Sequence, residues 1–154
     1  MANLSTTKQL KRAFEDLATR HKFINSFHWV KDSDLGASIK VIYPALVVHP
    51  IDATMLKAED GTFKMMEYKF IVKVLDLTEK DESNELDVES DTLQILTEIV
   101  NELNLNFDNS NIVIQDDVTF EPLDEYSDDE ATGWQGDLTI KTPVNNSNCF
   151  LPFK

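Results

Sequence analysis

The sequence predicts an α+β fold: a mostly antiparallel β-sheet with two α-helices packed on one face. Three stretches support this prediction: a helix-like segment at 5–22, an alternating strand at 64–77, and a second helix-like segment at 91–104. The expected order is α-β-β-β-α-β-β. Because 154 residues are the size of one domain, residues 1–154 are expected to form a single domain with a short C-terminal tail at about 145–154.

The first helix is expected because apolar side chains recur at helical spacing. Leu10, Phe14 and Leu17 lie three or four residues apart, which places them on one face. Serine and threonine residues before them can cap the N-terminus of the helix. His21 stands at the edge of this face, where a half-buried neutral side chain is expected.

Strand-like stretches follow at 23–30 and 39–50. Pro44 interrupts the second of them, and proline cannot donate a hydrogen bond to a sheet. This strand is therefore expected to lie at an edge, to contain a bulge, or to begin after Pro44. Residues 52–63 include an Asp-Gly pair and are expected to form a hairpin or a longer loop.

The strand at 64–77 is the clearest in the sequence because its two faces differ. An apolar face opposite a mixed one is typical of an antiparallel sheet that helices cover on one side. The mixed face is expected to be partly solvated or to meet another subunit. The apolar face holds Met66, Tyr68, Phe70, Val72 and Val74, and the mixed face holds Glu67, Lys69, Ile71, Lys73 and Leu75.

The second helix is expected at 91–104, with Ser90 as its N-cap and an acidic segment at 78–90 before it. Acids near the start of a helix interact favourably with its dipole. Two β-prone pieces then flank Gln115–Asp117, and the last strand is expected at 136–144.

The net charge of −14 is unevenly distributed. Residues 1–80 carry 12 Lys and Arg against 10 Asp and Glu, whereas residues 81–154 carry 2 against 18. Tight DNA binding through the acidic half is disfavoured because phosphate contacts need basic side chains. An acidic surface instead repels DNA or pairs with a basic partner; it could also simply keep the chain soluble.

No catalytic, metal or cofactor site emerges from the motifs, and we expect a protein that is not an enzyme. The three histidines and the single Cys149 lack zinc-ligand spacing, and no phosphate-binding glycine loop is present. A loose calcium site among the acids stays open. The chain has no apolar run long enough to span a membrane, and the lone cysteine fits assembly in the cytoplasm.

The stretch DEYSDDEATGWQGDLTI at 124–140 is expected to form an exposed acidic loop and then a turn at Gly133–Gly136, with Trp134 as its apolar anchor. The acidic loop of one copy could meet the basic first helix of the next, a head-to-tail contact that can close into a ring. The candidate interface or channel-facing residues are Lys8, Lys11, Arg12, Asp124, Glu125, Asp128, Asp129, Glu130 and Trp134.

The order of elements and several stretches resemble the tail terminator and neck (head-to-tail joining) proteins of tailed bacteriophages. The resemblance covers nearly the whole chain. The stretches are QLKRAFEDLA, YPALVVHP, EYKFIVKVLDL, SDTLQILTEIVNEL, and FEPLDEY followed by GWQGDLTI.

The resemblance implies a structural virion protein that forms a homo-oligomeric ring, commonly a hexamer, at the tail end or head–tail neck. It implies contacts with the tail tube and the portal or connector, and a channel through which genomic DNA passes without specific binding. The virion would be assembled in the bacterial host cytoplasm. The alternatives are a tail-assembly chaperone or connector adaptor, and an acidic module that mimics DNA to occupy a basic protein.

Overall fold

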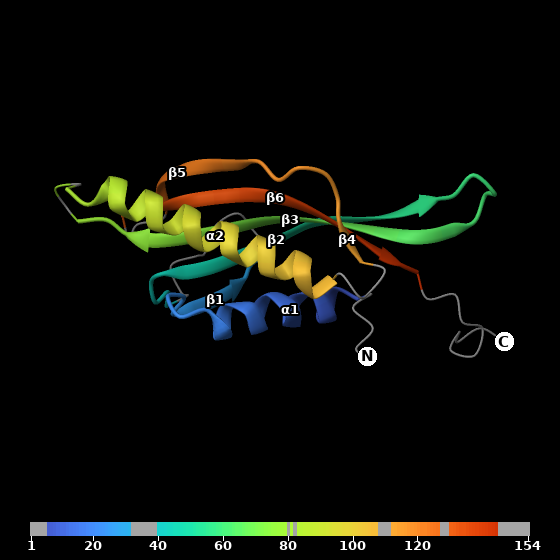
Figure 1. Ribbon diagram of the computed structural model, residues 1–154, viewed down its shortest axis with the longest axis horizontal. Helices are drawn as coiled ribbons and strands as arrows, with labels where there is room; N and C mark the ends of the chain where they lie inside the picture. Colours follow the sequence, from blue (N-terminus) through green and yellow to red (C-terminus); the bar gives the residue numbers. More distant parts are fainter. Residues whose placement is uncertain are drawn as a thin grey trace.

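The computed structural model confirms the α+β prediction (Figure 1). It describes residues 6–31, 40–79, 81, 83–107, 112–126 and 130–144, without the side chains of 124–126. The described part forms two helices and one mixed, mostly antiparallel sheet of six strands. The elements are α1 (Thr7–Arg20), β1 (Ser26–Trp29), β2 (Ala45–Lys57), β3 (Phe63–Leu77), α2 (Glu85–Phe107), β4 (Val113–Ile114), β5 (Phe120–Tyr126) and β6 (Ala131–Pro143).

The sheet is built around β3, which pairs antiparallel with β2 on one side and β6 on the other. Beyond β2 lies β1, the one strand paired in parallel. Both β4 and β5 pair with β6, at different positions along it. The two β-prone pieces expected around Gln115–Asp117 are therefore present as separate short strands.

Both helices pack on one face of the sheet, as expected. The main core lies between the helices and this face. Phe70 on β3 is central to this core, because the rings of Phe14 on α1 and Trp29 on β1 meet it edge-on, at centroid distances of 5.5 and 5.6 Å. From the same face of β3, Tyr68, Val72 and Val74 are also buried, and Met66 packs against them.

The mixed face of β3 is covered at one end only. Lys73 and Leu75 are buried there, and a smaller apolar cluster forms around Leu75 with Val47 and Ala131. Toward the other end, Lys69 is exposed. The expectation of a partly solvated face is thus correct for one half of the strand.

Pro44 precedes β2, so the third of the three expectations for it is correct: the strand begins after the proline. The Tyr43–Pro44 peptide bond is cis. The hairpin expected at 52–63 is present, because β2 continues to Lys57 and pairs antiparallel with β3; the alternative of a longer loop is wrong. The chain reverses at 58–62, where Gly61 adopts a φ of 83° and its N–H donates to the carbonyl of Ala58.

The end of this hairpin projects beyond the helices (Figure 1). We call this projection the arm: Ile51–Lys57 of β2, the turn at 58–62, and Phe63–Glu67 of β3. Because β1 pairs with β2 only from Ala45 to Val48, the outer backbone edge of the arm has no neighbouring strand among the described residues.

The predicted start of the second helix is wrong. The helix begins at Glu85, inside the segment expected to be an acidic loop, and Ser90 lies within it. The reason is that Val88 and Thr92 are buried and extend the apolar face by more than one turn toward the N-terminus. The acids of this segment thus belong partly to the first turns of α2.

The predicted turn at Gly133–Gly136 is also wrong, because both glycines lie within β6. Gly133 pairs with Leu75 of β3 and Gly136 with Val72. A Cβ atom at position 133 would overlap the carbonyl oxygen of Val74. This glycine therefore serves the close approach of two strands and not a chain reversal.

Candidate functional site

The first two turns of α1 present a basic surface. Thr6 caps the helix with Gln9 as its partner, and the buried side chains fix which face points outward. Three basic side chains are exposed on the outer face of this helix, because Lys11 and Arg12 follow Lys8 by three and four residues. Among the described residues, none of the three forms an ion pair. We call these three residues the basic patch.

The last turn of α1, in contrast, has its charges partnered. Arg20 Nε lies 2.9 Å from Asp16 Oδ2, and its Nη1 lies 3.9 Å from Glu102 Oε1 on α2. His21 Nε2 lies 2.8 Å from Glu98 Oε2, also on α2. The pairs with Glu98 and Glu102 join the two helices, and the basic patch is left as the unpaired part of α1 among the described residues.

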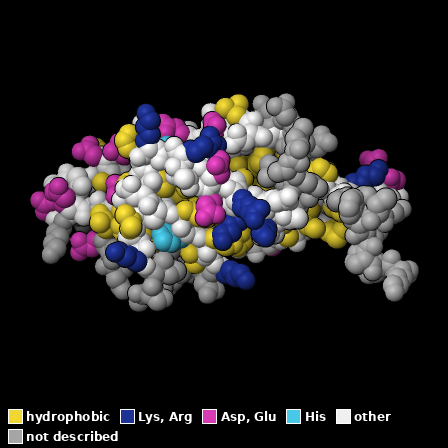
Figure 2. Space-filling model, turned by 90° about the horizontal axis from the view of Figure 1, so that it is seen from below, with side chains coloured by type: hydrophobic (Ala, Val, Ile, Leu, Met, Phe, Trp, Pro, Cys, Tyr) yellow, Lys and Arg dark blue, Asp and Glu magenta, His cyan; other side chains and the backbone are white. Residues whose placement is uncertain are grey.

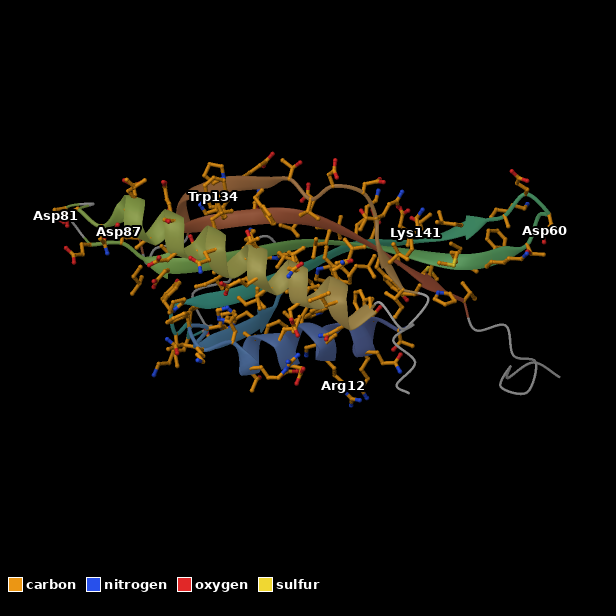
Figure 3. The ribbon with its side chains drawn as sticks, in the orientation of Figure 1. Arg12, Asp60, Asp81, Asp87, Trp134 and Lys141 are labelled. Atoms are coloured by element: carbon orange, nitrogen blue, oxygen red, sulfur yellow. The ribbon has the colours of Figure 1, made fainter. Side chains whose placement is uncertain are left out.

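Acidic side chains gather where β3 ends and α2 begins. We call Asp76, Asp81, Asp87 and Asp91 the acidic end; Figure 3 shows Asp81 and Asp87 together there, at the opposite end of the molecule from Asp60. The carboxylate of Asp81 accepts a hydrogen bond from the backbone N–H of Ser83, 3.1 Å away. Hydrogen bonds from Ser83 lower the pKa of Asp81, so this carboxylate is ionised at neutral pH.

A pocket of about 340 Å³ opens beside Asp76 and Asp91. Burial raises the pKa of Asp76, and the negative charge of Asp91 raises it further. Phe23, Pro44 and Ile95 supply an apolar lining. This combination is suited to a cationic side chain with an apolar stem, because the cation would relieve the repulsion between the two carboxylates.

The basic patch and the acidic end lie apart on the molecule. Figure 2 shows several acidic side chains at one end and a group of basic ones near the middle, with a few of either kind elsewhere on this face. Arg12 lies below α1, on the side away from the sheet (Figure 3). One copy therefore presents two surfaces of opposite charge that do not meet each other.

The predicted acidic loop is only partly within the described residues. Asp124 and Glu125 belong to β5 and their side chains lie outside the described part, as do Asp128 and Asp129 altogether. Glu130 is exposed, with a φ of 55°, and its carbonyl accepts hydrogen bonds from Thr78.

Trp134 supports the fold from within β6. Its Nε1–H donates to the carbonyl of Glu89 on α2, at 2.9 Å, and its ring packs against the main core. It holds the early turns of α2 onto the sheet and does not anchor a turn.

Sequence reasoning missed Asp76 and the length of the arm. The alternation along β3 contains Asp76, but only the fold places it beside Asp91. The Asp-Gly pair at 60–61 predicts the hairpin, and the signal for its length is that a tight turn implies strands that extend up to it.

In the described part of the chain, no three His, Cys, Asp or Glu side chains come close enough together to hold a metal ion. No helix there is both long and apolar enough to cross a membrane. No protein-family model and no curated protein matches this chain. The relation to tail terminator and neck proteins therefore stays a hypothesis.

Proposed function

We propose that the protein is a non-catalytic structural subunit that assembles head to tail into a ring. The observation that carries this proposal is the separation of the unpaired basic patch from the acidic end. In the ring, the patch of one copy meets the acidic end of the next. Contacts between two different surfaces of the same chain close into rings when the rotation between copies allows it.

Each side of this contact carries three exposed charges. Lys8, Lys11 and Arg12 are exposed, and three of the four carboxylates of the acidic end are exposed as well. An exposed ion pair contributes about 0.2–1 kcal/mol, so three pairs contribute roughly 0.6–3 kcal/mol per contact. Charge therefore selects the register between copies, and apolar contacts must supply the rest of the affinity.

We propose further that this ring stands at the tail end or neck of a tailed bacteriophage, with genomic DNA passing through it. The resemblance in element order supports this placement, as does the net charge of −14. A strongly acidic ring repels the DNA backbone, which lets the duplex move through without sticking. Its neighbours would be the tail tube and the portal or connector.

The test is the mass of the purified protein by light scattering at low and high salt. The wild-type chain is expected to form one closed oligomer that loosens as salt rises, because salt screens exposed ion pairs. The variant K8E/K11E/R12E should dissociate at low salt. Adding D81K, D87K and D91K to it should restore the oligomer, because the three exposed charges on each side of the contact are then reversed.

A matched control is K69E, which reverses an exposed lysine on the opposite face of the sheet. It should leave the mass unchanged. A wild-type chain that stays monomeric at low salt and high concentration overturns the proposal. So does a triple variant that assembles as the wild type does.

A further inference from the structure

The arm exposes apolar side chains away from the main core. Ile51, Met55 and Phe63 are 53%, 47% and 44% exposed, although the ring of Phe63 lies 5.7 Å from Lys57 Nζ. The two strands of the arm pair with each other, with Met55 opposite Met66 and register shifts at Pro50/Asp52 and at Leu56/Lys57, and Met65 pairs with Pro143 of β6. The arm therefore projects as a paired hairpin and does not fold back onto its own body (Figure 1).

The outer edge of the arm is also open. No β1 residue pairs with β2 beyond Val48, so among the described residues the N–H and C=O groups of alternate residues along Ile51–Lys57 face outward without a neighbouring strand. Proline, which protects many edge strands, is missing from this stretch. An open edge with exposed apolar side chains is typical of a surface that another chain covers.

A second unfilled apolar surface lies on the body of the same chain, between α2 and the segment that joins β4 to β5. It is a groove of about 310 Å³. We call it the α2 groove. Apolar lining comes from Val100, Ile114, Val118 and Phe120, and polar lining from Thr97, Asn101, Asn104 and Asp116.

We propose that the arm of one copy binds the α2 groove of a second copy. This inference rests on the proposed ring, because it names the apolar contact that the charge contact alone does not supply. Met55 and Phe63 are the side chains that would enter the groove. The occupant is a second copy because this chain carries both halves of the contact, a projecting apolar element and a receiving apolar groove.

The pairing is head to tail and not two-fold. A projecting element that fits a groove elsewhere on the same chain makes a heterologous contact, which leaves one free arm and one free groove at the ends of any open assembly. Ring closure removes both free ends. An arm that paired edge to edge with another arm would instead give a symmetric dimer.

Three variants test the proposal, each first checked for a wild-type circular dichroism spectrum. M55D places a charge on the arm and N101W fills the α2 groove from an exposed helix position. I42D is the control, because Ile42 is 52% exposed and belongs to neither surface. Each of the first two variants should weaken self-association by about tenfold or more, from losing one buried apolar side chain per contact, and I42D should assemble normally.

Mixing M55D with N101W distinguishes the two geometries. A head-to-tail contact predicts a 1:1 dimer in native mass spectrometry, since the arm of the N101W copy still fits the groove of the M55D copy. No such dimer should form from either variant alone. If N101W assembles as the wild type does while M55D does not, arms pair with arms and the groove assignment is overturned.

The two proposals fail in different ways. A monomeric wild-type chain removes the ring itself. A wild-type ring that persists in both M55D and N101W overturns the arm contact and leaves the charge contact standing.

Discussion

Replacing Gly133 by alanine is expected to destabilise the protein strongly, even though the change adds one methyl group. Gly133 is buried in β6, directly opposite Leu75 of β3. The added Cβ would overlap the carbonyl oxygen of Val74 and lie 3.1 Å from the Cα of Leu75. Both are backbone atoms of the central strand, so relief requires β3 and β6 to move apart.

Gly136→Ala provides the matched control because its added methyl group meets a side chain. The nearest atom is Cδ1 of Phe120, at 2.7 Å, and this half-buried ring can move aside. Overpacking costs about 1–3 kcal/mol, and we expect G133A at the upper end of this range. We expect G136A near the lower end, since alanine also reduces the entropy of the unfolded chain by about 0.4–1 kcal/mol.

Urea denaturation followed by circular dichroism measures both free energies of unfolding. A loss of about 3 kcal/mol corresponds to a fall in Tm of roughly 6–12 °C for a chain of this size. If G133A is no less stable than G136A, the close approach of β3 and β6 is refuted, and the turn predicted from the sequence at these glycines becomes the better interpretation.

Three further predictions concern single contacts. Trp134→Phe removes the hydrogen bond to the carbonyl of Glu89. It should lower the free energy of unfolding in urea by about 1–3 kcal/mol, because this partly buried carbonyl loses its donor. An unchanged stability would contradict this contact. Phe14→Ala should lower the free energy of unfolding by about 3–5 kcal/mol in the same assay, since Phe14 is fully buried. A loss below about 1 kcal/mol would show that α1 does not pack on the sheet. Asp60 should titrate with a pKa of about 2 by NMR, because Thr62 donates to its carboxylate. Since this pKa lies below the ordinary value, the ionised carboxylate stabilises the turn at neutral pH, and this stabilisation is lost as the pH falls toward 2. The variant T62A should return the pKa of Asp60 toward its usual value.

The sequence was most informative where one face of an element is buried. The spacing of Leu10, Phe14 and Leu17 predicts α1, and the alternation along 64–77 predicts β3, because burial of one face imposes its period on the sequence. The start of α2 was missed for the opposite reason. Its first turn holds Glu85 and Asp87, and acids at a helix N-terminus have the same composition as an acidic loop.

Glycine and long-range contacts account for the remaining differences. A glycine can mark a turn or a close approach of two strands, and only the register between β3 and β6 shows that Gly133 is the second kind. The basic patch was predictable, because Lys8, Lys11 and Arg12 belong to one helix. The acidic end was predictable only in part: Asp81 and Asp87 lie in the acidic segment at 78–90, whereas only the fold brings Asp76 of β3 beside Asp91 of α2.

Electron microscopy of the purified protein at low salt tests the central claim most directly. The account predicts class averages that show a closed ring with a central opening, and predicts that the K8E/K11E/R12E variant shows none. Isolated particles of single-copy size at every concentration, or compact dimers without an opening, would contradict the head-to-tail ring.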